Sequence, residues 1–240
     1  MLVTNMMRRA SERCGAEVLV IEDSGDRNPL ESEETVCDLF DQEAIERQFD
    51  EFGPVDGIVN LLGFGQERYD GETVHRAARQ SFHAAKAWRQ HHGGNPGEDH
   101  FWVAITGMGG RLGFDQATSP LPVCGAVCGF TKSLGREWPD ADIRVVDVPR
   151  EGFYPDLGLQ ILAETFADVP SLEVGLLGGV RYLPVAVSAD EIIGYGAGES
   201  LAPDSESVLL MAGGAKGITS RVAFDLAERY GCKQIGRAHV

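Results

Sequence analysis

The chain has 240 residues, of which 43% are hydrophobic, and a formal net charge of −16. This length accommodates one full α/β domain and part of another. The negative charge argues against nucleic acids and anionic membranes as partners, because both would repel the chain. No apolar run has transmembrane length and no basic-then-apolar leader follows Met1, so we expect a cytoplasmic protein. The five cysteines lack a ligand-like spacing, and we expect reduced thiols and no metal site.

The first three quarters of the chain alternate short apolar runs with helical patterns. This alternation predicts a parallel sheet covered by helices on both faces. Asp41 is placed to cap a helix that ends before Gly53-Pro54. A doubly wound domain has a strand and a glycine turn ahead of the run EVLVI, and none is present, so we expect a truncated N-terminus. Predicted strands cover residues 17–21, 36–39, 55–62, 101–105 and 143–148, and predicted helices cover 41–52, 71–91, 126–137 and 155–167.

A hairpin and a linker follow this alternating region. Residues 172–177 and 180–187 are apolar and flank Gly178-Gly179, which predicts two antiparallel strands. Pro184 has no N–H to donate, so the second strand is expected at an edge of the sheet. Residues 188–206 are rich in Gly, Ala, Ser and acidic residues, which is typical of a linker between domains.

The most informative segment begins at Ser207. An apolar run at 208–211 predicts a buried strand, a glycine turn follows, and the spacing of Val222, Leu226 and Tyr230 predicts one helix face. A strand, glycine turn and helix bring bare N–H groups to a phosphate, although an empty turn of the same kind is an alternative. Lys216 could contact a 2′-phosphate or could be a solvated lysine at a helix start. The predicted cofactor-binding residues are Gly213, Gly214, Ala215, Lys216, Gly217, Ile218 and Thr219.

This segment resembles the start of the catalytic half of a ketoreductase domain from a polyketide or polyunsaturated fatty acid synthase, a relative of the short-chain dehydrogenases/reductases. In that resemblance GGAKGIT is the dinucleotide loop, with Ala212 where many relatives have Thr and Thr219 where many have a third Gly. The resemblance implies NADP as cofactor and a carrier-protein-bound β-ketoacyl thioester as substrate. It also implies other synthase domains as partners and a homodimeric parent. Upstream, Asp38 and Asn60 match polar positions near the cofactor, although strand-end roles explain both residues better.

The catalytic positions of that family are empty in this sequence. Aligning the run GFTKSL puts Pro120 where the family has its proton-donating Tyr and Cys124 where it has its Lys. Gly107 stands where the family has the Ser that polarises the substrate carbonyl. None of the three can donate a proton to a carbonyl or carry a buried positive charge, so we predict no catalytic residue. Lys132 and Tyr154 lack a partner at the required spacing, and we interpret them as a helix-surface and a loop residue.

The predicted fold is therefore an α/β fold with a Rossmann-like doubly wound parallel sheet and the first β-α unit of a second Rossmann subdomain. Residues 1–187 form a catalytically empty structural subdomain, 188–206 the linker, and 207–234 the start of an NADP-binding catalytic subdomain. Residues 235–240 (IGRAHV) contain no apolar strand and match the translation of a common sequencing adapter, so we expect a non-native tail; a genuine polar tail is the alternative. The function hypothesis is a fragment of an NADPH-dependent β-ketoacyl reductase that is inactive by itself. A non-catalytic scaffold or dimerisation module is the alternative.

Overall fold

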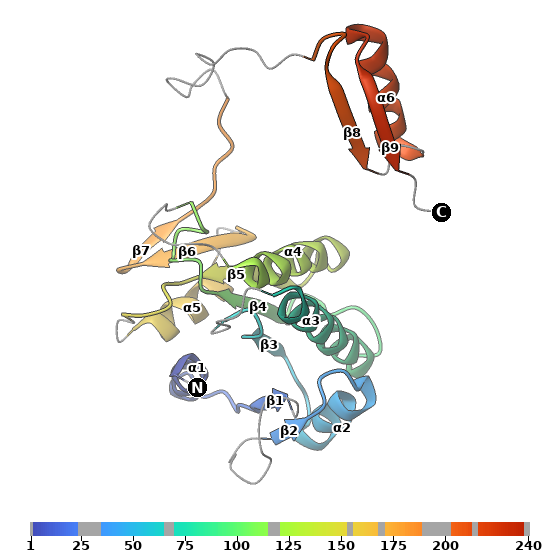
Figure 1. Ribbon diagram of the computed structural model, residues 1–240. Coiled ribbons are helices and arrows are strands. Elements are labelled where there is room, and N and C mark those ends of the chain that lie inside the picture. The colour runs from blue at the N-terminus through green and yellow to red at the C-terminus, as the bar shows by residue number, and fades with distance from the viewer. Residues whose placement is uncertain are drawn as a thin grey trace. The chain divides into compact units, whose positions relative to one another are not determined.

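A computed structural model describes residues 2–23, 35–64, 70–114, 121–152, 156–167, 171–188, 203–212 and 216–237. Backbone contacts divide the chain into two compact units, Met1–Val185 and Ala186–Val240, which we call unit 1 and unit 2. Figure 1 shows the elements of both units. None of the described helices is both long and apolar enough to cross a membrane.

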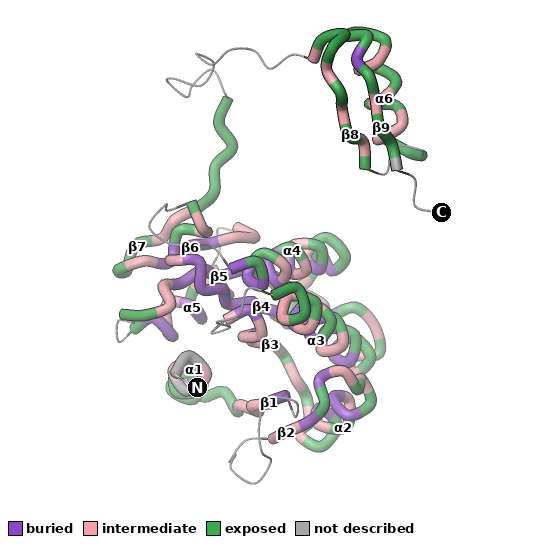
Figure 2. Tube along the Cα trace, in the orientation of Figure 1, coloured by how far each residue is buried: buried purple, intermediate pink, exposed green. Residues whose placement is uncertain are grey.

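Unit 1 is built on a sheet of five strands in the order β3, β4, β5, β6, β7. The first four strands are parallel, and β7 returns antiparallel to β6 through Gly178 and Gly179, which both have positive φ. Strands β4 and β5 are buried on both faces, which is typical of interior strands in a doubly wound sheet (Figure 2). The bounds are β3 Gly57–Asn60, β4 Phe101–Thr106, β5 Asp142–Asp147, β6 Glu173–Leu177 and β7 Val180–Tyr182.

Helices cover both faces of this sheet. On one face, α1 and α5 contribute to a core cluster that contains Val103 and Val146. On the other face, α2, α3 and α4 pack around Trp88 and Trp102. The side chain of Asp41 accepts hydrogen bonds from the amides of Glu43 and Ala44 and caps α2, as the sequence predicted. The bounds are α1 Leu2–Arg13, α2 Gln42–Phe52, α3 Gly71–His91, α4 Pro122–Glu137 and α5 Leu157–Thr165.

Two further strands of unit 1 form a separate parallel pair. Strand β1 (Ile21–Asp23) pairs with β2 (Thr35–Cys37), and among the described residues neither strand pairs with the larger sheet. Leu19 and Ile21 nevertheless pack against the core cluster that contains Trp88 and Trp102. The predicted strand at residues 17–21 is thus displaced toward its C-terminal end, where β2 supplies a backbone partner.

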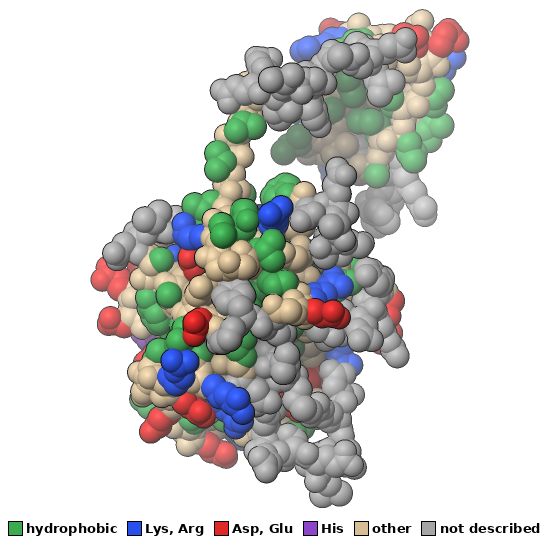
Figure 3. All heavy atoms as spheres, turned by 90° about the vertical axis from the view of Figure 1, so that its left-hand side faces the viewer, with side chains coloured by type: hydrophobic (Ala, Val, Ile, Leu, Met, Phe, Trp, Pro, Cys, Tyr) green, Lys and Arg blue, Asp and Glu red, His purple; other side chains and the backbone are tan. Residues whose placement is uncertain are grey.

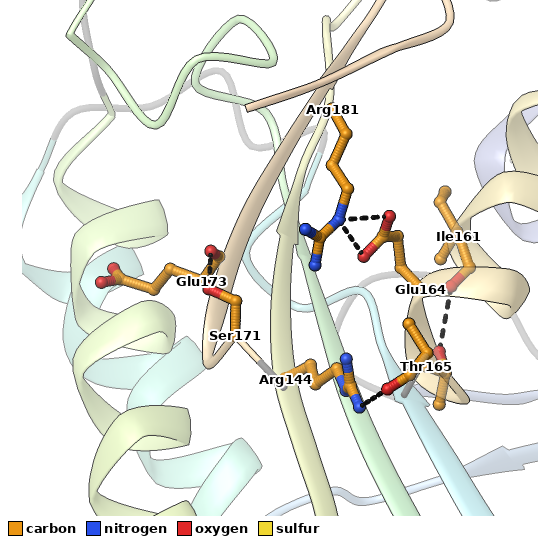
Figure 4. Close-up of polar contacts among 8 residues, drawn as sticks. Arg144, Ile161, Glu164, Thr165, Ser171, Glu173 and Arg181 are labelled. Carbon is orange, nitrogen blue, oxygen red and sulfur yellow. Dashed lines mark hydrogen bonds and ion pairs between the residues drawn. The ribbon is translucent and has the colours of Figure 1, made fainter. Parts of the chain in front are cut away.

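Polar side chains tie α5 to the end of the sheet (Figure 4). The Arg181 guanidinium on β7 donates from Nε to both carboxylate oxygens of Glu164 on α5, at 2.7 and 2.8 Å. Arg144 on β5 is 4% exposed and donates from Nη2 to the carbonyl of Ala167 at 2.9 Å, just beyond α5. These contacts hold the helix against β5 and β7. They also give the buried guanidinium groups hydrogen-bond partners, without which burial of their charge would be costly.

Unit 2 contains β8 (Val208–Ala212), α6 (Gly217–Tyr230) and β9 (Lys233–Arg237), with β8 and β9 parallel. Residues 235–237, in the tail where the sequence shows no apolar strand, form the last part of β9. Gly231 ends α6 in the left-handed conformation, and the chain then pairs along β8, so backbone partners form a strand without an apolar pattern.

Hydrophobic side chains lie exposed on the extended segment after β7. Val185 and Val187 in this segment are 77% and 55% exposed (Figure 3).

Candidate functional site

The predicted cofactor loop lies between β8 and α6. Gly213, Gly214 and Ala215 fall outside the described residues, whereas Lys216 to Thr219 are described. Lys216 is exposed and takes the N-cap position in an extended conformation (φ −145°, ψ 162°). Gly217 follows with φ 65°, and a Cβ there would meet no described atom within 4 Å. Ile218 is 82% exposed and Thr219 is half-buried. The first described residues of this turn, Lys216 to Ile218, are therefore exposed.

The first turn of α6 has the electrostatics of an anion site. Among the described residues no side chain caps the helix, and the first turn contains no acidic residue. The hydroxyl of Ser220 donates to the carbonyl of Gly217 at 2.8 Å and therefore does not satisfy the amides. A helix N-terminus with uncapped N–H groups and a favourable dipole binds phosphate. The described half of the loop thus has uncapped amides of the kind that could hold a phosphate group.

In unit 1, the aligned positions of the reductase chemistry are occupied by structural contacts. Cys124, at the Lys position, is fully buried on α4 and donates from Sγ to the carbonyl of Gly63 at 3.2 Å. Burial raises the pKa of the Cys124 thiol, so it stays neutral. Gly107, at the Ser position, accepts a 2.7 Å hydrogen bond from Arg150 Nε through its carbonyl. Pro120, at the Tyr position, and Tyr154 lie outside the described residues.

The other polar positions near the strand ends are also used internally. Asn60 is 4% exposed and donates from Nδ2 to the hydroxyl of Ser81 at 2.9 Å, while its Oδ1 accepts from the amide of Leu62. Asp38 is exposed, and its Oδ1 accepts from the amide of Phe40 at 2.8 Å. These contacts match the strand-end and turn roles that the sequence favoured for both residues.

Lys132 on α4 has a structural partner on β6. Its Nζ lies 3.1 Å from Glu173 Oε1 on β6, and the thiol of Cys128 donates to the same oxygen at 3.0 Å. Burial and the neighbouring carboxylate of Glu173 raise the pKa of Cys128 to about 12. Lys132 is thus partly exposed, as expected for a helix-surface residue, and is held in an ion pair.

Sequence reasoning missed a buried carboxylate that organises the loop after β4. Asp147 is fully buried at the end of β5; its Oδ1 accepts from the Thr106 hydroxyl at 2.9 Å and the Met108 amide at 2.6 Å. Its Oδ2 accepts from the amide of Leu112 at 2.9 Å. Burial raises the pKa of Asp147, and these hydrogen bonds oppose the rise. The glycine-rich run GMGGRLG before a strand-end Asp was the available signal.

The structure offers no metal centre in its described parts. No group of three or more His, Cys, Asp or Glu side chains there is arranged to hold an ion. All five cysteines are free thiols, and Cys37, Cys124, Cys128 and Cys232 are buried. Burial raises the pKa of Cys37, Cys124 and Cys128, which makes these three thiols poor metal ligands.

No family model matches the sequence. Over 131 residues, or 52% of the chain, the sequence is 30% identical to a polyunsaturated fatty acid synthase polypeptide of Thraustochytrium sp., of which the chain covers 4%. A solved N-terminal ketoreductase from the macrolactin assembly line matches 97% of the chain with a TM-score of 0.65 and 14% identity. The first ketoreductase of the tylosin polyketide synthase matches 98% with a TM-score of 0.60 and 15% identity.

A third similar structure contains adenylation, ketoreductase and pseudo-Asub domains of a keto acid-selecting peptide synthetase module. It matches 96% of the chain with a TM-score of 0.66 and 14% identity. The chain spans 46% and 52% of the two ketoreductase structures and 20% of this module. The chain therefore has the Rossmann-like fold of the ketoreductase domains of multidomain synthases, and the predicted fold class is confirmed.

Proposed function

We propose that this chain is part of an NADPH-dependent β-ketoacyl reductase domain of a multifunctional polyketide or polyunsaturated fatty acid synthase. Residues 1–187 are the structural subdomain, 188–206 a linker, and 207–234 the start of the NADP-binding subdomain. The parent is a cytoplasmic homodimer that reduces a β-ketoacyl thioester on an acyl carrier protein to the β-hydroxy form. NADPH, when bound, supplies the hydride.

The observation that carries the proposal is the uncapped start of α6. Its first-turn amides have no side-chain cap, and Gly217 keeps the backbone bare at φ 65°. In the proposal these amides and the loop residues 213–215 hold the pyrophosphate. Lys216 is exposed at the N-cap, where its ammonium can approach a 2′-phosphate. Similarity to a polyunsaturated fatty acid synthase polypeptide and to solved ketoreductases supports the synthase context.

A charge-specific pair of variants tests the cofactor site. Asp and Asn tolerate positive φ almost equally, so Gly217→Asp and Gly217→Asn impose the same backbone strain. The carboxylate of the Asp variant repels pyrophosphate, and we expect its NADPH affinity to fall at least about tenfold below that of the Asn variant, or about 1.4 kcal/mol. Titration followed by nucleotide fluorescence measures the difference. Equal affinities for the two variants would remove this turn from the cofactor site.

A variant of Lys216 provides a second test, which asks whether the site prefers NADP over NAD. Replacing Lys216 by Gln removes the charge but keeps a side chain of similar length. If the ammonium contacts a 2′-phosphate, NADPH binding weakens while NADH binding does not change. Equal weakening of both nucleotides, or of neither, would contradict the assignment of a 2′-phosphate contact.

The proposal also predicts that the 240-residue chain has no reductase activity. None of its five tyrosines is followed by Lys four residues later, so the proton donor and its charged partner are missing. The absorbance of NADPH should stay constant when the purified chain is mixed with a β-ketoacyl thioester. Steady oxidation of NADPH would contradict this prediction.

A non-catalytic scaffold is the second candidate, because the aligned catalytic positions of unit 1 are used in structural contacts. Cys124 and Gly107 are both committed to backbone hydrogen bonds within unit 1. The coding sequence around the chain separates the two candidates. A downstream Tyr-x-x-x-Lys segment with carrier or ketosynthase regions supports the reductase, whereas a stop codon directly after residue 240 supports the scaffold.

A further inference from the structure

The turn that joins α3 to β4 is closed by side chains as well as by backbone bonds. The amide of Gly97 donates to Nδ1 of His100 at 3.1 Å, and the amide of His100 donates to the carbonyl of Gly97 at 3.0 Å. At the end of α3, Nε of Arg89 donates to Oδ1 of Asn95 at 2.8 Å. We call residues 95–99, which these contacts hold in place, the strap.

The ring of His100 also belongs to a tight group of rings at the end of α3. Its centroid lies 4.1 Å from that of His92, the residue that caps the C-terminus of the helix. Both imidazoles lie edge-on to the fully buried indole of Trp88, at centroid distances of 5.4 and 6.1 Å. Nε2 of His92 lies 3.1 Å from the carbonyl oxygen of Val55. The position of the His100 ring is therefore set by the strap on one side and by His92 on the other.

These contacts determine which ring nitrogens carry protons while the strap is closed. A backbone amide only donates, so Nδ1 of His100 must keep a lone pair to accept from Gly97. A carbonyl only accepts, so Nε2 of His92 carries a proton in both the neutral and the charged ring. His92 can therefore gain a proton at Nδ1 and keep its bond to Val55. His100 cannot gain a proton at Nδ1 without losing its bond to Gly97.

A second proton on this pair also meets repulsion between the two rings. Two positive charges on partly buried rings 4.1 Å apart disfavour each other. The lowered pKa of His92, which burial causes first and the His100 ring second, agrees with this repulsion. The closed strap thus accommodates one proton at most on the pair, whereas an open strap separates the rings and allows two.

Further charged groups surround the pair. Asp56 favours the charged form of His92, while His91 acts in the opposite direction and itself lies 3.2 Å from Asp50. The carboxylates next to His100 belong to the strap and to the start of β5, and they are Glu98, Asp99 and Asp142. The first two are exposed and the third is half-exposed. Because solvent screens such charges, they attract an imidazolium in the closed and the open strap alike.

We propose that the strap is a pH-sensitive switch, which is closed while Nδ1 of His100 accepts from Gly97 and opens when acid protonates both rings. Opening also breaks the contact between Arg89 and Asn95, but that hydrogen bond is exposed and its net contribution is modest. It brings Pro96, which is buried in the closed strap, into solvent. The proposal concerns unit 1 alone and does not depend on the proposed reductase function.

Amide exchange with water, measured by NMR on the 240-residue chain, tests the proposal. The observed rate is compared with the intrinsic rate at each pH to give a protection factor. We expect the protection of the Gly97 amide to fall at least about tenfold between about pH 7.5 and pH 5.5, because the open strap binds at least one proton more than the closed strap. The amides of β4, and those of Gly93 and Gly94, which donate to carbonyls of α3, should keep their protection within about twofold.

Two variants separate the titration from the loss of a contact. His100→Asn keeps an acceptor oxygen near the position of Nδ1 but does not titrate, so the protection of Gly97 should become independent of pH. Asn95→Ala is the matched control, because it removes the exposed contact with Arg89 and leaves both rings in place. It should lower the protection of Gly97 at every pH and leave the ratio between the two pH values unchanged.

Three outcomes would overturn the proposal. The first is protection of Gly97 that does not change with pH in the unaltered chain. The second is the same fall in His100→Asn, because that result assigns the opening to other groups. The third is a fall that the amides of β4 share, because that result is unfolding of unit 1 and not opening of the strap. A fall that is confined to the strap and abolished in His100→Asn supports the proposal.

Discussion

Two glycine-rich loops, one in each unit, follow a parallel strand and lead toward a helix, yet their described residues are packed differently. In unit 1 the loop after β4 closes around the carboxylate of Asp147, which accepts from the Met108 and Leu112 amides. A Cβ at Gly110 would lie 2.4 Å from the carbonyl oxygen of Leu176. In unit 2 the turn before α6 has no side-chain cap, and Gly217 meets no described atom within 4 Å.

The difference shows that a glycine pattern alone does not identify a ligand site. Both loops use glycine to reach positive φ, at Gly109, Gly110 and Gly113 in one and at Gly217 in the other. In unit 1 the protein itself supplies the carboxylate, which accepts hydrogen bonds from the Met108 and Leu112 amides. In unit 2 the described amides at the start of α6 have no such partner among the side chains, which leaves them for a phosphate.

The largest expected effect comes from adding a methyl group to each loop. Gly110→Ala combines a left-handed residue with a clash against the Leu176 carbonyl, and we expect a loss of about 3 kcal/mol in the unfolding free energy of unit 1. Gly217→Ala imposes similar strain in open space and should leave unit 1 unaffected. All three tryptophans, Trp88, Trp102 and Trp138, lie in unit 1, so tryptophan fluorescence during urea unfolding reports on this unit.

A control separates the clash from the backbone strain. Gly152 also belongs to unit 1 and has φ 71°, but a Cβ there meets no described atom within 4 Å. Gly152→Ala should therefore cost only about 1 kcal/mol. Equal losses for the Gly110 and Gly152 variants would mean that the loop after β4 is not packed against β6.

The second-largest expected effect is the loss of stability in Asp147→Asn, which tests whether the loop after β4 depends on the buried carboxylate. Asn at this position keeps one acceptor oxygen but turns an NH₂ group toward buried donors, and we expect a loss of about 1–3 kcal/mol. Asp140→Asn is the matched control, because Asp140 is exposed beyond α4 and should change stability by less than about 0.5 kcal/mol. Urea unfolding followed by tryptophan fluorescence measures both. A neutral Asp147→Asn variant would show that the loop does not depend on the carboxylate.

The contrast between the loops also marks what the sequence could predict. Helix α3 has the predicted bounds, because its apolar stripe and the Asp70 cap are local signals. Helix α4 begins at Pro122, before the predicted start at residue 126, since proline is well tolerated in a first turn. Strand β9 was missed because its partner β8, rather than its own side chains, determines it. The role of Asp147 was missed because its three donors come from β4 and the loop after it, about 40 residues away in the sequence.

The lengths of the short strands also could not be predicted from side-chain pattern alone. The run EVLVI predicts a strand at residues 17–21, yet β1 covers only Ile21–Asp23, opposite Thr35–Cys37 of β2. Side-chain pattern identifies an apolar segment, but pairing decides which of its residues form a ladder. For the candidate site, the sequence identified the turn before α6, and the structure added that its described residues are open and uncapped.

The smallest expected effect is a pH dependence of unit 1 that arises from His92 on the C-terminal side of α3. Burial lowers the pKa of His92, and the His100 ring, with centroids 4.1 Å apart, lowers it further. His91 lies beside it and pairs with Asp50, while Asp56 acts in the opposite direction. Because the unfolded chain binds this proton more readily, stability is complete above the ordinary histidine pKa of about 6.5 and falls as the pH decreases through that value.

The urea midpoint of the tryptophan transition should therefore drop between about pH 7 and pH 5.5. His92 Nε2 lies 3.1 Å from the Val55 carbonyl, and Gln can keep a donor at that position while it removes the titration. We expect His92→Gln to flatten the pH profile, whereas His75→Gln, at an exposed position on α3, should leave the slope unchanged. An unaltered slope in the His92 variant would assign the dependence to other groups of unit 1, since every tryptophan that reports it lies there.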